Sequence, residues 1–312
     1  MIKKKKIRAI VLFSGGLDSI LAIKILEKQK IEILALIFES YFFNGEEAEK
    51  IAKELKFNFR IFDFSEEHLK MVKNPKYGYG RAMNPCVDCH ALMLKKAKEI
   101  MEKEKFDFVA TGEVLGERPM SQNAGALKLI EKQSALDGYL IRPLSAKLLI
   151  ESIPEKSGWI KRSELLDISG RSRKRQIALA EEFAIKNYPS PAGGCLLTES
   201  AFGERLKKLL INCPNCGGND IELLKSGRHL WENGAKIIIG RNKDENEKLG
   251  ESAKKGDILI QLKDYPGPLT IIRNYQKGKI KKEILDKARE LTQYYSLKAR
   301  NKKDLKFKEK IF

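Results

Sequence analysis

The sequence predicts an α/β fold with a parallel sheet, followed by a smaller α+β domain. Apolar, β-rich runs alternate with helical patterns along the first third of the chain, which is typical of a parallel sheet. A glycine-rich turn joins the first of these strands to the first helix, and two further strand signals precede a helical stretch near the C-terminus. The expected strands are residues 7–14, 31–38, 57–64, 106–111, 235–239 and 258–262. The expected helices are residues 18–29, 46–56 and 91–104.

The turn after the first strand is the hexapeptide Ser14-Gly15-Gly16-Leu17-Asp18-Ser19. A strand, a glycine turn and a helix in this order direct backbone N–H groups and a helix N-terminus at a phosphate. Asp18 supplies a carboxylate for Mg²⁺, and Ser19 supplies a hydroxyl for phosphate oxygens or capping. The segment lacks the Gly-Lys-Ser/Thr of a Walker loop and the G-x-G-x-x-G of a dinucleotide site, so it predicts a different phosphate loop.

Polar residues follow the other strands as well. Glu39 and the pair Thr111-Gly112 stand at the carboxyl ends of their strands, where α/β sheets bind ligands. Residues 65–90 interrupt the alternation and predict a long functional loop. His68, in an acidic stretch of that segment, is expected to be a surface residue.

Length and composition set the domain organisation. At 312 residues the chain is expected to hold a nucleotide-binding domain (1–145), a basic helical extension (146–204) and a third domain (205–312). No apolar run reaches the length of about 18 residues that a membrane span needs. A basic start is followed at once by a strand and a phosphate loop, so we expect a cytoplasmic protein without a membrane partner.

Charge is the second strong signal. The chain carries 60 Lys and Arg against 42 Asp and Glu, a net charge of +18. Fourteen basic and five acidic residues fall in 271–312, so half of the excess lies in a basic C-terminal tail. A solvated lysine-rich surface would also give such a composition, but clustering favours a polyanionic partner such as nucleic acid.

The five cysteines have the spacing of a metal or redox site rather than of a disulfide framework. Cys86 and Cys89 form one Cys-x2-Cys pair, and Cys195 follows a run of small residues. The three thiolates could hold three irons of a [4Fe–4S] cluster, bind zinc together with His90 or water, or form a persulfide and resolving pair. Cys213 and Cys216 form a second pair, for which two thiols are expected; a zinc shared across a homodimer is the alternative.

The phosphate loop resembles that of the PP-loop ATP pyrophosphatases, which have an adenine nucleotide alpha hydrolase-like fold and cleave ATP to AMP and pyrophosphate. The Cys86-x2-Cys89 pair, the run Ala110 to Glu113, Arg118 to Gln122 and the segment Gly193 to Thr198 together resemble the iron–sulfur-dependent tRNA thiouridine synthetases of that group. The sequence has no N-terminal RNA-capture domain like that of 4-thiouridine synthases, which leaves the target nucleotide open.

This resemblance implies an ATP-dependent tRNA sulfurtransferase that adenylates a uracil carbonyl and replaces its oxygen with sulfur. It implies ATP, Mg²⁺ and a [4Fe–4S] cluster as cofactors, with tRNA and a sulfur donor (sulfide, a persulfide or a carrier protein) as partners. The expected catalytic residues are Asp18, Cys86, Cys89 and Cys195, and these three cysteines are the expected cluster ligands. The expected nucleotide-binding residues are Ser14, Gly15, Gly16, Asp18, Ser19, Thr111 and Gly112.

The C-terminal region resembles the NFACT-R module, an RNA-binding domain. The likeness rests on Gly227-Arg228-His229, on Ile237 to Asn242 and on Tyr265 to Pro268. The basic residues expected to contact RNA are Arg118, Arg171, Arg173, Lys174, Arg228 and Arg241, and Lys243, Arg273 and Lys277 are expected on the same surface. Two other functions stay open: a PP-loop sulfur transferase for a small molecule, and a non-catalytic nucleotide- and RNA-binding protein.

Overall fold

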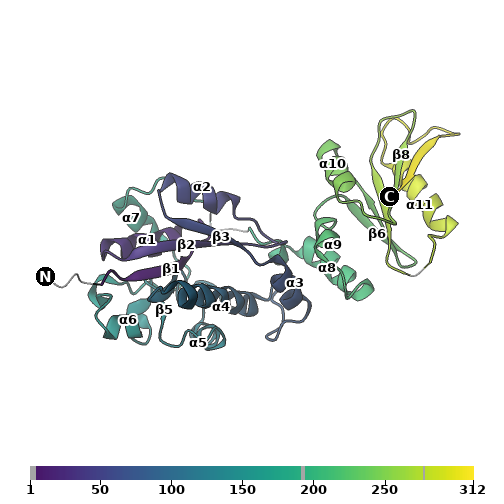
Figure 1. Cartoon of the computed structure of the whole chain (residues 1–312). Helices are drawn as coiled ribbons and strands as arrows, with labels where there is room; N and C mark the ends of the chain where they lie inside the picture. The colour runs from purple at the N-terminus through teal and green to yellow at the C-terminus, as the bar shows by residue number, and fades with distance from the viewer. Residues whose placement is uncertain (1–4, 191–193, 277) are drawn as a thin grey trace. The chain divides into compact units, whose positions relative to one another are not determined.

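A computed structural model describes residues 5–190, 194–276 and 278–312, so Gly193 and Lys277 lie outside the described residues. The chain forms two compact units, Met1–Thr198 and Glu199–Phe312 (Figure 1). In the part of the chain that the structure describes, no helix combines the length and the apolar character that crossing a membrane requires.

The first unit contains the predicted parallel sheet. Its strands are β1 (Arg8–Leu12), β2 (Glu32–Glu39), β3 (Phe59–Asp63), β4 (Phe108–Thr111) and β5 (Leu140–Ile141). They lie in the order β3-β2-β1-β4-β5, and every neighbouring pair is parallel. The order reverses between β1 and β4, so the carboxyl ends of these two strands frame the crevice where such sheets bind ligands.

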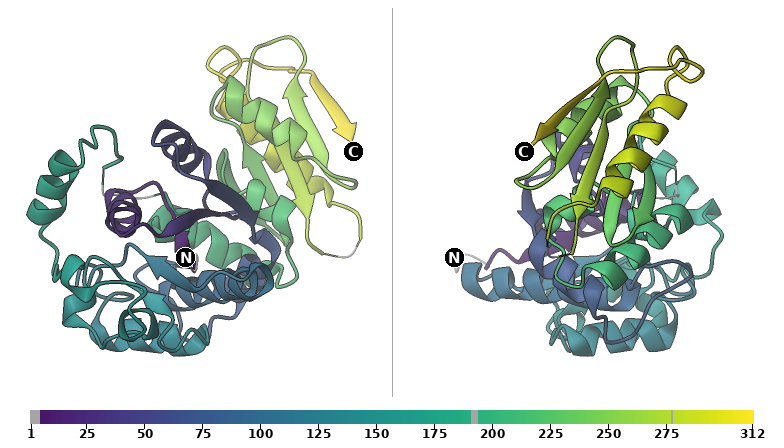
Figure 2. Two further views of the ribbon diagram at one scale, coloured as in Figure 1. Left: turned by 60° about the vertical axis from the view of Figure 1, so that its left-hand side comes forward. Right: turned by 90° about the vertical axis from the view of Figure 1, so that its right-hand side faces the viewer.

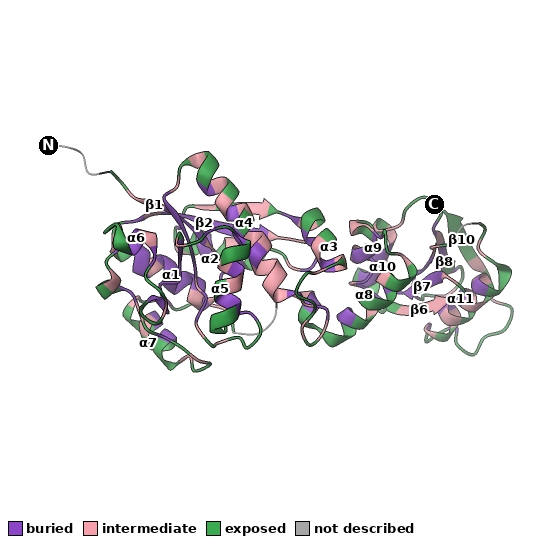
Figure 3. Cartoon of the chain, turned by 90° about the horizontal axis from the view of Figure 1, so that it is seen from below, coloured by how far each residue is buried: buried purple, intermediate pink, exposed green. Residues whose placement is uncertain are grey.

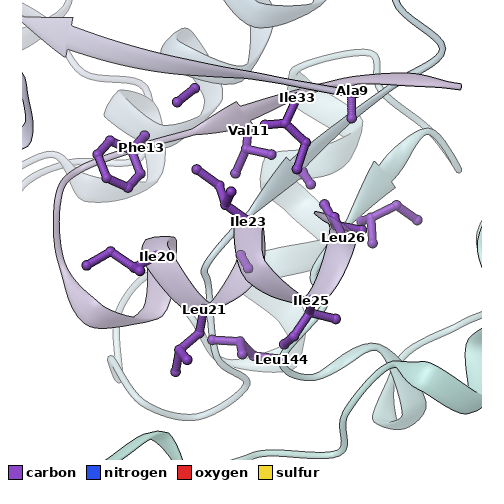
Figure 4. Close-up of a cluster of buried hydrophobic side chains, with 14 of the residues drawn as sticks. Ala9, Val11, Phe13, Ile20, Leu21, Ile23, Ile25, Leu26, Ile33 and Leu144 are labelled. Carbon is purple, nitrogen blue, oxygen red and sulfur yellow. The ribbon is translucent and has the colours of Figure 1, made fainter. Parts of the chain in front are cut away.

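Helices cover both faces of this sheet, as Figures 1 and 2 show. One face packs against α1 (Leu17–Lys28), α2 (Glu46–Glu54) and α7 (Lys174–Glu182). The other packs against α4 (Cys86–Glu104) and α5 (Ala124–Gln133). Figure 4 shows how α1 buries its apolar side chains against β1 and β2.

The predicted strands and helices of the first unit are confirmed, with two differences in residues 65–90. A helix, α3 (Ser65–Lys73), occupies the start of this expected loop, and α4 begins at Cys86, before the expected start at 91. His68 is fully buried, so its predicted place on the surface is wrong. Its ring stacks on Phe64 with centroids 4.7 Å apart, and burial lowers its pKa to about 4. His68, Leu69 and Val72 share the buried face of an amphipathic helix whose acidic residues face solvent.

Residues 143–198 are less helical than expected, because most of their elements are single turns. They are the 3-10 helices η1 (Ala146–Leu148), η2 (Arg162–Glu164) and η3 (Leu196–Thr198) and the short helix α6 (Ile153–Lys156). Irregular backbone joins these turns around α7, and it places polar side chains near the phosphate loop.

The second unit is an antiparallel sheet with helices on both faces. Its strands are β6 (Arg228–Glu232), β7 (Ala235–Ile239), β8 (Ile258–Leu262), β9 (Thr270–Asn274) and β10 (Phe307–Ile311), in the order β10-β8-β9-β7-β6. Its helices are α8 (Ser200–Asn212), α9 (Gly218–Glu222), α10 (Lys243–Glu251) and α11 (Lys282–Tyr294). The strands predicted at 235–239 and 258–262 are confirmed.

Two apolar layers hold this sheet. Ile237, Ile260 and Ile272 face α11, whereas Ile238 and Ile271 face Leu223 beside α9 and Leu249 of α10. The basic C-terminal segment is part of the fold rather than a free tail, because it contributes β9, α11 and β10. β9 is largely buried and β10 is largely exposed, and Figure 3 shows that the surface of α11 is in part buried and in part exposed.

Candidate active site

The phosphate loop connects β1 to α1 in a conformation that needs glycine. Gly15 has φ +75°, and a Cβ on it would lie 2.9 Å from the Cα of Ala48 in α2. Gly16 is the N-cap of α1 and provides no capping side chain. The first N–H groups of α1 are therefore left for an external acceptor, and a phosphate is the acceptor that such a helix start favours.

The end of β4 packs directly against this loop. A Cβ on Gly112 would lie 2.5–2.6 Å from the backbone of Asp18 and Ser19, so only glycine permits the approach. Thr111 is buried, and its hydroxyl donates to Glu113 Oε2 over 3.0 Å. Thr111 is thus held within the protein, and Gly112 is the member of this predicted pair that borders the loop.

Arg118, Arg173 and Gln176 gather around Asp18. Both arginines lie close enough to act on the Asp18 carboxylate electrostatically, and the Gln176 amide faces it. Among the described residues, Asp18 Oδ1, Arg173 Nε and both polar atoms of the Gln176 side chain are buried without a hydrogen-bond partner. Burial raises the pKa of Asp18, and Arg173, Gln176 and Arg118 offset this only in part. Because buried polar groups in proteins are normally hydrogen-bonded, these atoms are expected to bind an ion, a ligand or water.

Two chain segments that run side by side bring these groups together. Leu115 forms an isolated parallel bridge with Ser169, and the Gly170 N–H donates to the Leu115 carbonyl over 2.8 Å. The Ser145 hydroxyl donates to the Ile168 carbonyl and accepts from the Leu115 N–H. These contacts fix the two loops that carry Arg118 and Arg173. Arg171 and Lys174 of the second segment are exposed.

A buried ionic network lies behind this site. Glu113 accepts hydrogen bonds from Thr111 and from Arg142 Nε, and it lies 2.8 Å from His90 Nδ1. Arg142 also donates to Glu131. Although burial alone would raise the pKa of Glu113, Arg142 and His90 lower it to about 2. The network joins the end of β4 to the start of α4, and therefore to the cysteines.

Cys86 and Cys89 lie in the first turn of α4, three residues apart and so on one face of the helix. The Cys89 N–H donates to the Pro85 carbonyl, and Asn84 Nδ2 donates to Cys86 Sγ over 3.2 Å. Cys195 reaches them from a distant segment. The backbone just after it is fixed by hydrogen bonds from Leu196 N–H to the Phe42 carbonyl and from Met83 N–H to the Leu197 carbonyl.

The three thiols interact with one another electrostatically. Burial raises the pKa of Cys89 well above its usual value, and Cys195, Cys86 and Asp88 raise it further. Among the described residues, no three Cys, His, Asp or Glu side chains are grouped closely enough for a single metal ion. In an iron–sulfur cluster each thiolate binds a different iron, so its ligands stand further apart. A cationic cluster would also stabilise the thiolates that this environment disfavours, so the residues fit such a cluster.

The basic residues predicted to bind RNA in the second unit have different environments. Arg228 is exposed and lies over the ring of Tyr295, 4.4 Å from its centroid. Arg241 is half-exposed and paired with Glu245, and Lys243 is exposed. The prediction that Arg273 lies on the RNA surface is wrong, because it is buried and bonded to Asp220 and Asp257. Arg273 is on the sheet face that α9 covers, which the sequence around it did not reveal.

Two residues at the site were missed from the sequence. Gln176 lies one helical turn after Arg173, so the two side chains share a face of the helix. Apart from this spacing, the sequence does not indicate that Gln176 belongs to the site. Arg142 is the partner of Glu113 across the end of the sheet, where no local pattern marks it. Both are recognisable only after residues far apart in the chain are brought together.

Comparisons with known proteins agree with this architecture. Residues 5–152 match the family model of the thiamine biosynthesis protein ThiI, and residues 227–311 match that of the NFACT protein RNA binding domain.

Three curated relatives illustrate the sequence similarity. A tRNA-specific 2-thiouridylase MnmA of Karelsulcia muelleri is 25% identical over 265 residues, which cover 79% of this chain and 65% of the relative. The MnmA of Geotalea uraniireducens is 30% identical over 35% of each chain. A probable tRNA sulfurtransferase of Finegoldia magna is 28% identical over 45% of this chain and 36% of its own length. The chain thus spans about two thirds of the first relative and about a third of the other two.

Two solved structures are also similar to the chain, with lower sequence identity than these relatives. A 4-thiouridine synthetase in complex with RNA and ATP is 21% identical, with a TM-score of 0.41 over 66% of this chain and 51% of the other. A predicted tRNA methyltransferase subunit of Methanocaldococcus jannaschii is 18% identical, with a TM-score of 0.37 over 56% of this chain and 76% of the other.

The sequence resemblance to PP-loop proteins and to the NFACT-R module is confirmed: residues 5–152 match the ThiI family model, and residues 227–311 match the model of the NFACT RNA binding domain.

Proposed function

We propose that this chain is an ATP-dependent tRNA sulfurtransferase that makes a thiouridine. One observation carries the proposal: the unit that holds the phosphate loop and the unsatisfied Asp18, Arg173 and Gln176 also gathers Cys86, Cys89 and Cys195. The names of the relatives, thiouridylases and a tRNA sulfurtransferase, support the same reaction. The RNA-binding family of the second unit supports tRNA as the partner.

The reaction begins with attack of a uracil carbonyl oxygen on the α-phosphorus of ATP, which expels pyrophosphate. The phosphate loop would hold the leaving group with its backbone N–H groups. Arg118 and Arg173 would offset the negative charge that develops there, and the Asp18 carboxylate would bind Mg²⁺ beside them. The adenylated base then has AMP as a good leaving group, which a sulfur nucleophile displaces.

Cys86, Cys89 and Cys195 would hold a [4Fe–4S] cluster in which the fourth iron is open to bind sulfide. Sulfide, or a carrier protein that releases sulfide, would supply the sulfur atom directly; a persulfide would do so only with two electrons from a pair of thiols, which would be oxidised to a disulfide. One set of contacts joins the thiols to the phosphate loop. His90, the residue after Cys89, contacts Glu113. Gly112, the residue before Glu113, packs against Asp18 of the loop. The two half-reactions therefore share a scaffold.

A reconstitution tests the proposal. The anaerobically purified chain, treated with iron and sulfide, is incubated with unmodified tRNA, Mg-ATP and sulfide. We expect AMP, pyrophosphate and thiouridine in equal amounts, with nucleosides identified by mass spectrometry. Pyrophosphate release without any thionucleoside would favour a small-molecule substrate, and RNA binding without ATP cleavage would favour a non-catalytic protein.

A further inference from the structure

Lys236 is the most unusual residue of the second unit. It lies in β7 with 0% of its surface exposed, and its Nζ has no hydrogen-bond partner among the described residues. Its Nζ lies over the Trp231 ring of β6, 5.4 Å from the ring centroid. Burying a lysine in this way is costly unless something compensates its charge.

Other unsatisfied donors lie around Lys236. His229 of β6 and Arg205 of α8 interact with it electrostatically. Both ring nitrogens of His229 and the Nε of Arg205 are buried without hydrogen-bond partners in the described part of the chain. Three elements therefore direct four unpartnered nitrogen atoms into one region, which we call the β6–β7 cluster (Arg205, His229 and Lys236).

Three carboxylates near this cluster form ion pairs with arginines outside it. Glu245 forms two-oxygen contacts with Arg241. Asp220 and Asp257 bond Arg273, the cross-strand neighbour of Lys236. Arg241 also acts on Arg205 and His229 with positive charge. Glu199 also acts on Arg205 with negative charge, but among the described residues no carboxylate is hydrogen-bonded to Lys236 Nζ, to His229 or to Arg205 Nε. These nitrogen atoms are therefore left for an external anion.

We propose that Arg205, His229 and Lys236 bind a phosphate group of the RNA backbone. The inference rests on the RNA partner of the proposed function and adds a site to it. A phosphate offers several acceptor oxygens and negative charge, which match donors converging from α8, β6 and β7. Arg205 and His229 are half-buried, so the cluster borders solvent through these two residues, whereas Lys236 lies behind them. Arg205 lies outside residues 227–311, so the site combines the RNA-binding segment with the helix before it.

A purely structural role for Lys236 predicts different behaviour. If Lys236 only stabilised the fold, its replacement by methionine, which has a similar volume, would destabilise the protein. If the site is kept for an anion, Lys236→Met removes a buried unpaired amine and raises the melting temperature of the RNA-free protein. The same substitution then weakens RNA binding.

The experiment measures the affinity of the full-length protein for an unmodified tRNA transcript at several salt concentrations. We expect Lys236→Met and Arg205→Gln each to weaken binding about tenfold and to flatten the salt slope by about one. The control is Lys248→Gln, which is exposed on α10 and lies outside both the cluster and the residues expected to contact RNA; it should change affinity less than about twofold. Wild-type affinity and slope in both cluster variants would overturn the proposal, as would failure of the wild-type protein to bind tRNA.

A local probe separates RNA phosphate from free phosphate. The chain has two tryptophans, so Trp159→Phe leaves Trp231 as the only indole beside Lys236. We expect its fluorescence to change on adding tRNA, and to stop responding after Lys236→Met. A response to inorganic phosphate at constant ionic strength, with tRNA affinity unaffected by Lys236→Met, would assign the site to a free anion and overturn the RNA assignment.

Pyrophosphate release from ATP is measured for the same variants to keep the two proposals apart. Lys236→Met should lose tRNA affinity while its Asp18 site is intact. Loss of tRNA affinity in the cluster variants of a protein that never cleaves ATP would support this site and contradict the proposed enzyme. If those variants cleave ATP and thiolate tRNA with undiminished tRNA affinity, the proposed enzyme is supported and this phosphate site is contradicted.

Discussion

At the scale of single residues, the phosphate loop and its neighbours hold buried polar groups without partners. Asp18, Arg173 and Gln176 bury polar atoms that no described residue satisfies. Asp18 also has a raised pKa because its burial outweighs the nearby arginines. Mg²⁺ and the phosphates of ATP would satisfy the carboxylate and the donors together. This supports the proposal that these residues bind the ligand.

We expect Asp18→Asn to reduce pyrophosphate release by at least about a hundredfold, since it removes the carboxylate that faces the phosphates. Arg173→Gln should lower the rate by a similar order. The control is Lys186→Gln, since Lys186 is exposed in the same unit and is not among the residues expected to contact ATP or RNA; turnover should stay within about twofold. Pyrophosphate release is followed with a coupled assay. Full activity in Asp18→Asn would remove this residue from the mechanism.

Glu113 gives a prediction for the pH dependence of stability. Its folded pKa is about 2, below the ordinary value of 4.5, so its stabilising effect is complete above pH 4.5 and is lost as the pH falls towards 2. We expect Glu113→Gln to lower the free energy of unfolding by about 3 kcal/mol at pH 7. Urea unfolding from pH 7 to 3 should show the difference from wild type shrinking. A difference independent of pH would mean that Glu113 acts by packing alone.

At the scale of elements, three segments build the thiol site. The first turn of α4 presents Cys86 and Cys89, and Asp88 in the same turn accepts the backbone N–H groups of Lys76 and Tyr77. The segment around η3 is tied to Phe42 and Met83 and carries Cys195. The helix start therefore organises the preceding loop as well as two of the thiols.

This arrangement predicts which cysteines hold iron. We expect Cys86→Ser, Cys89→Ser and Cys195→Ser each to lose the oxygen-sensitive [4Fe–4S] signal and the bound iron and sulfide. The double variant Cys213→Ser, Cys216→Ser is the control, because these thiols lie in the other unit. Iron analysis and electron paramagnetic resonance after anaerobic reconstitution provide the measurements. An iron-free protein that thiolates tRNA from a persulfide would show that two of the thiols act by persulfide chemistry instead.

At the scale of the whole molecule, the net charge is concentrated in one segment of the chain. Half of the net +18 lies in residues 271–312, which are built into β9, α11 and β10. Deleting this segment would remove a central strand of the sheet, so a truncation cannot separate RNA binding from folding. Substitution of exposed lysines can.

We expect replacement of Lys279, Lys281 and Lys282 by glutamine to weaken tRNA binding and to flatten its salt slope by up to about three. All three are exposed, so the free energy of unfolding should stay within about 0.5 kcal/mol of wild type for each substitution. Lys95→Gln with Lys103→Gln, exposed on α4, serves as the control. Equal salt slopes in the triple variant and the wild type would identify this charge as a solvated surface only.

The sequence alone determined the parallel sheet and the glycine turn after its first strand, because each has a local signature. The division into domains was expected in three parts, whereas the structure has two compact units, Met1–Thr198 and Glu199–Phe312. Alternating apolar runs reveal strands and helices, and a glycine turn between them reveals an anion site. It also singled out Cys86, Cys89 and Cys195. The prediction that His68 and Arg273 lie on the surface was wrong, because a single polar residue does not reveal which face of its helix or strand is covered.

Only the tertiary structure decided which distant residues meet. It placed Arg118, Arg173 and Gln176 around Asp18, paired Glu113 with Arg142, and enclosed Lys236 among cations of other elements. These long-range contacts depend on which chain segments pack side by side. Packing is decided by the sum of many weak apolar contacts over the whole fold, and no short stretch of sequence encodes that sum.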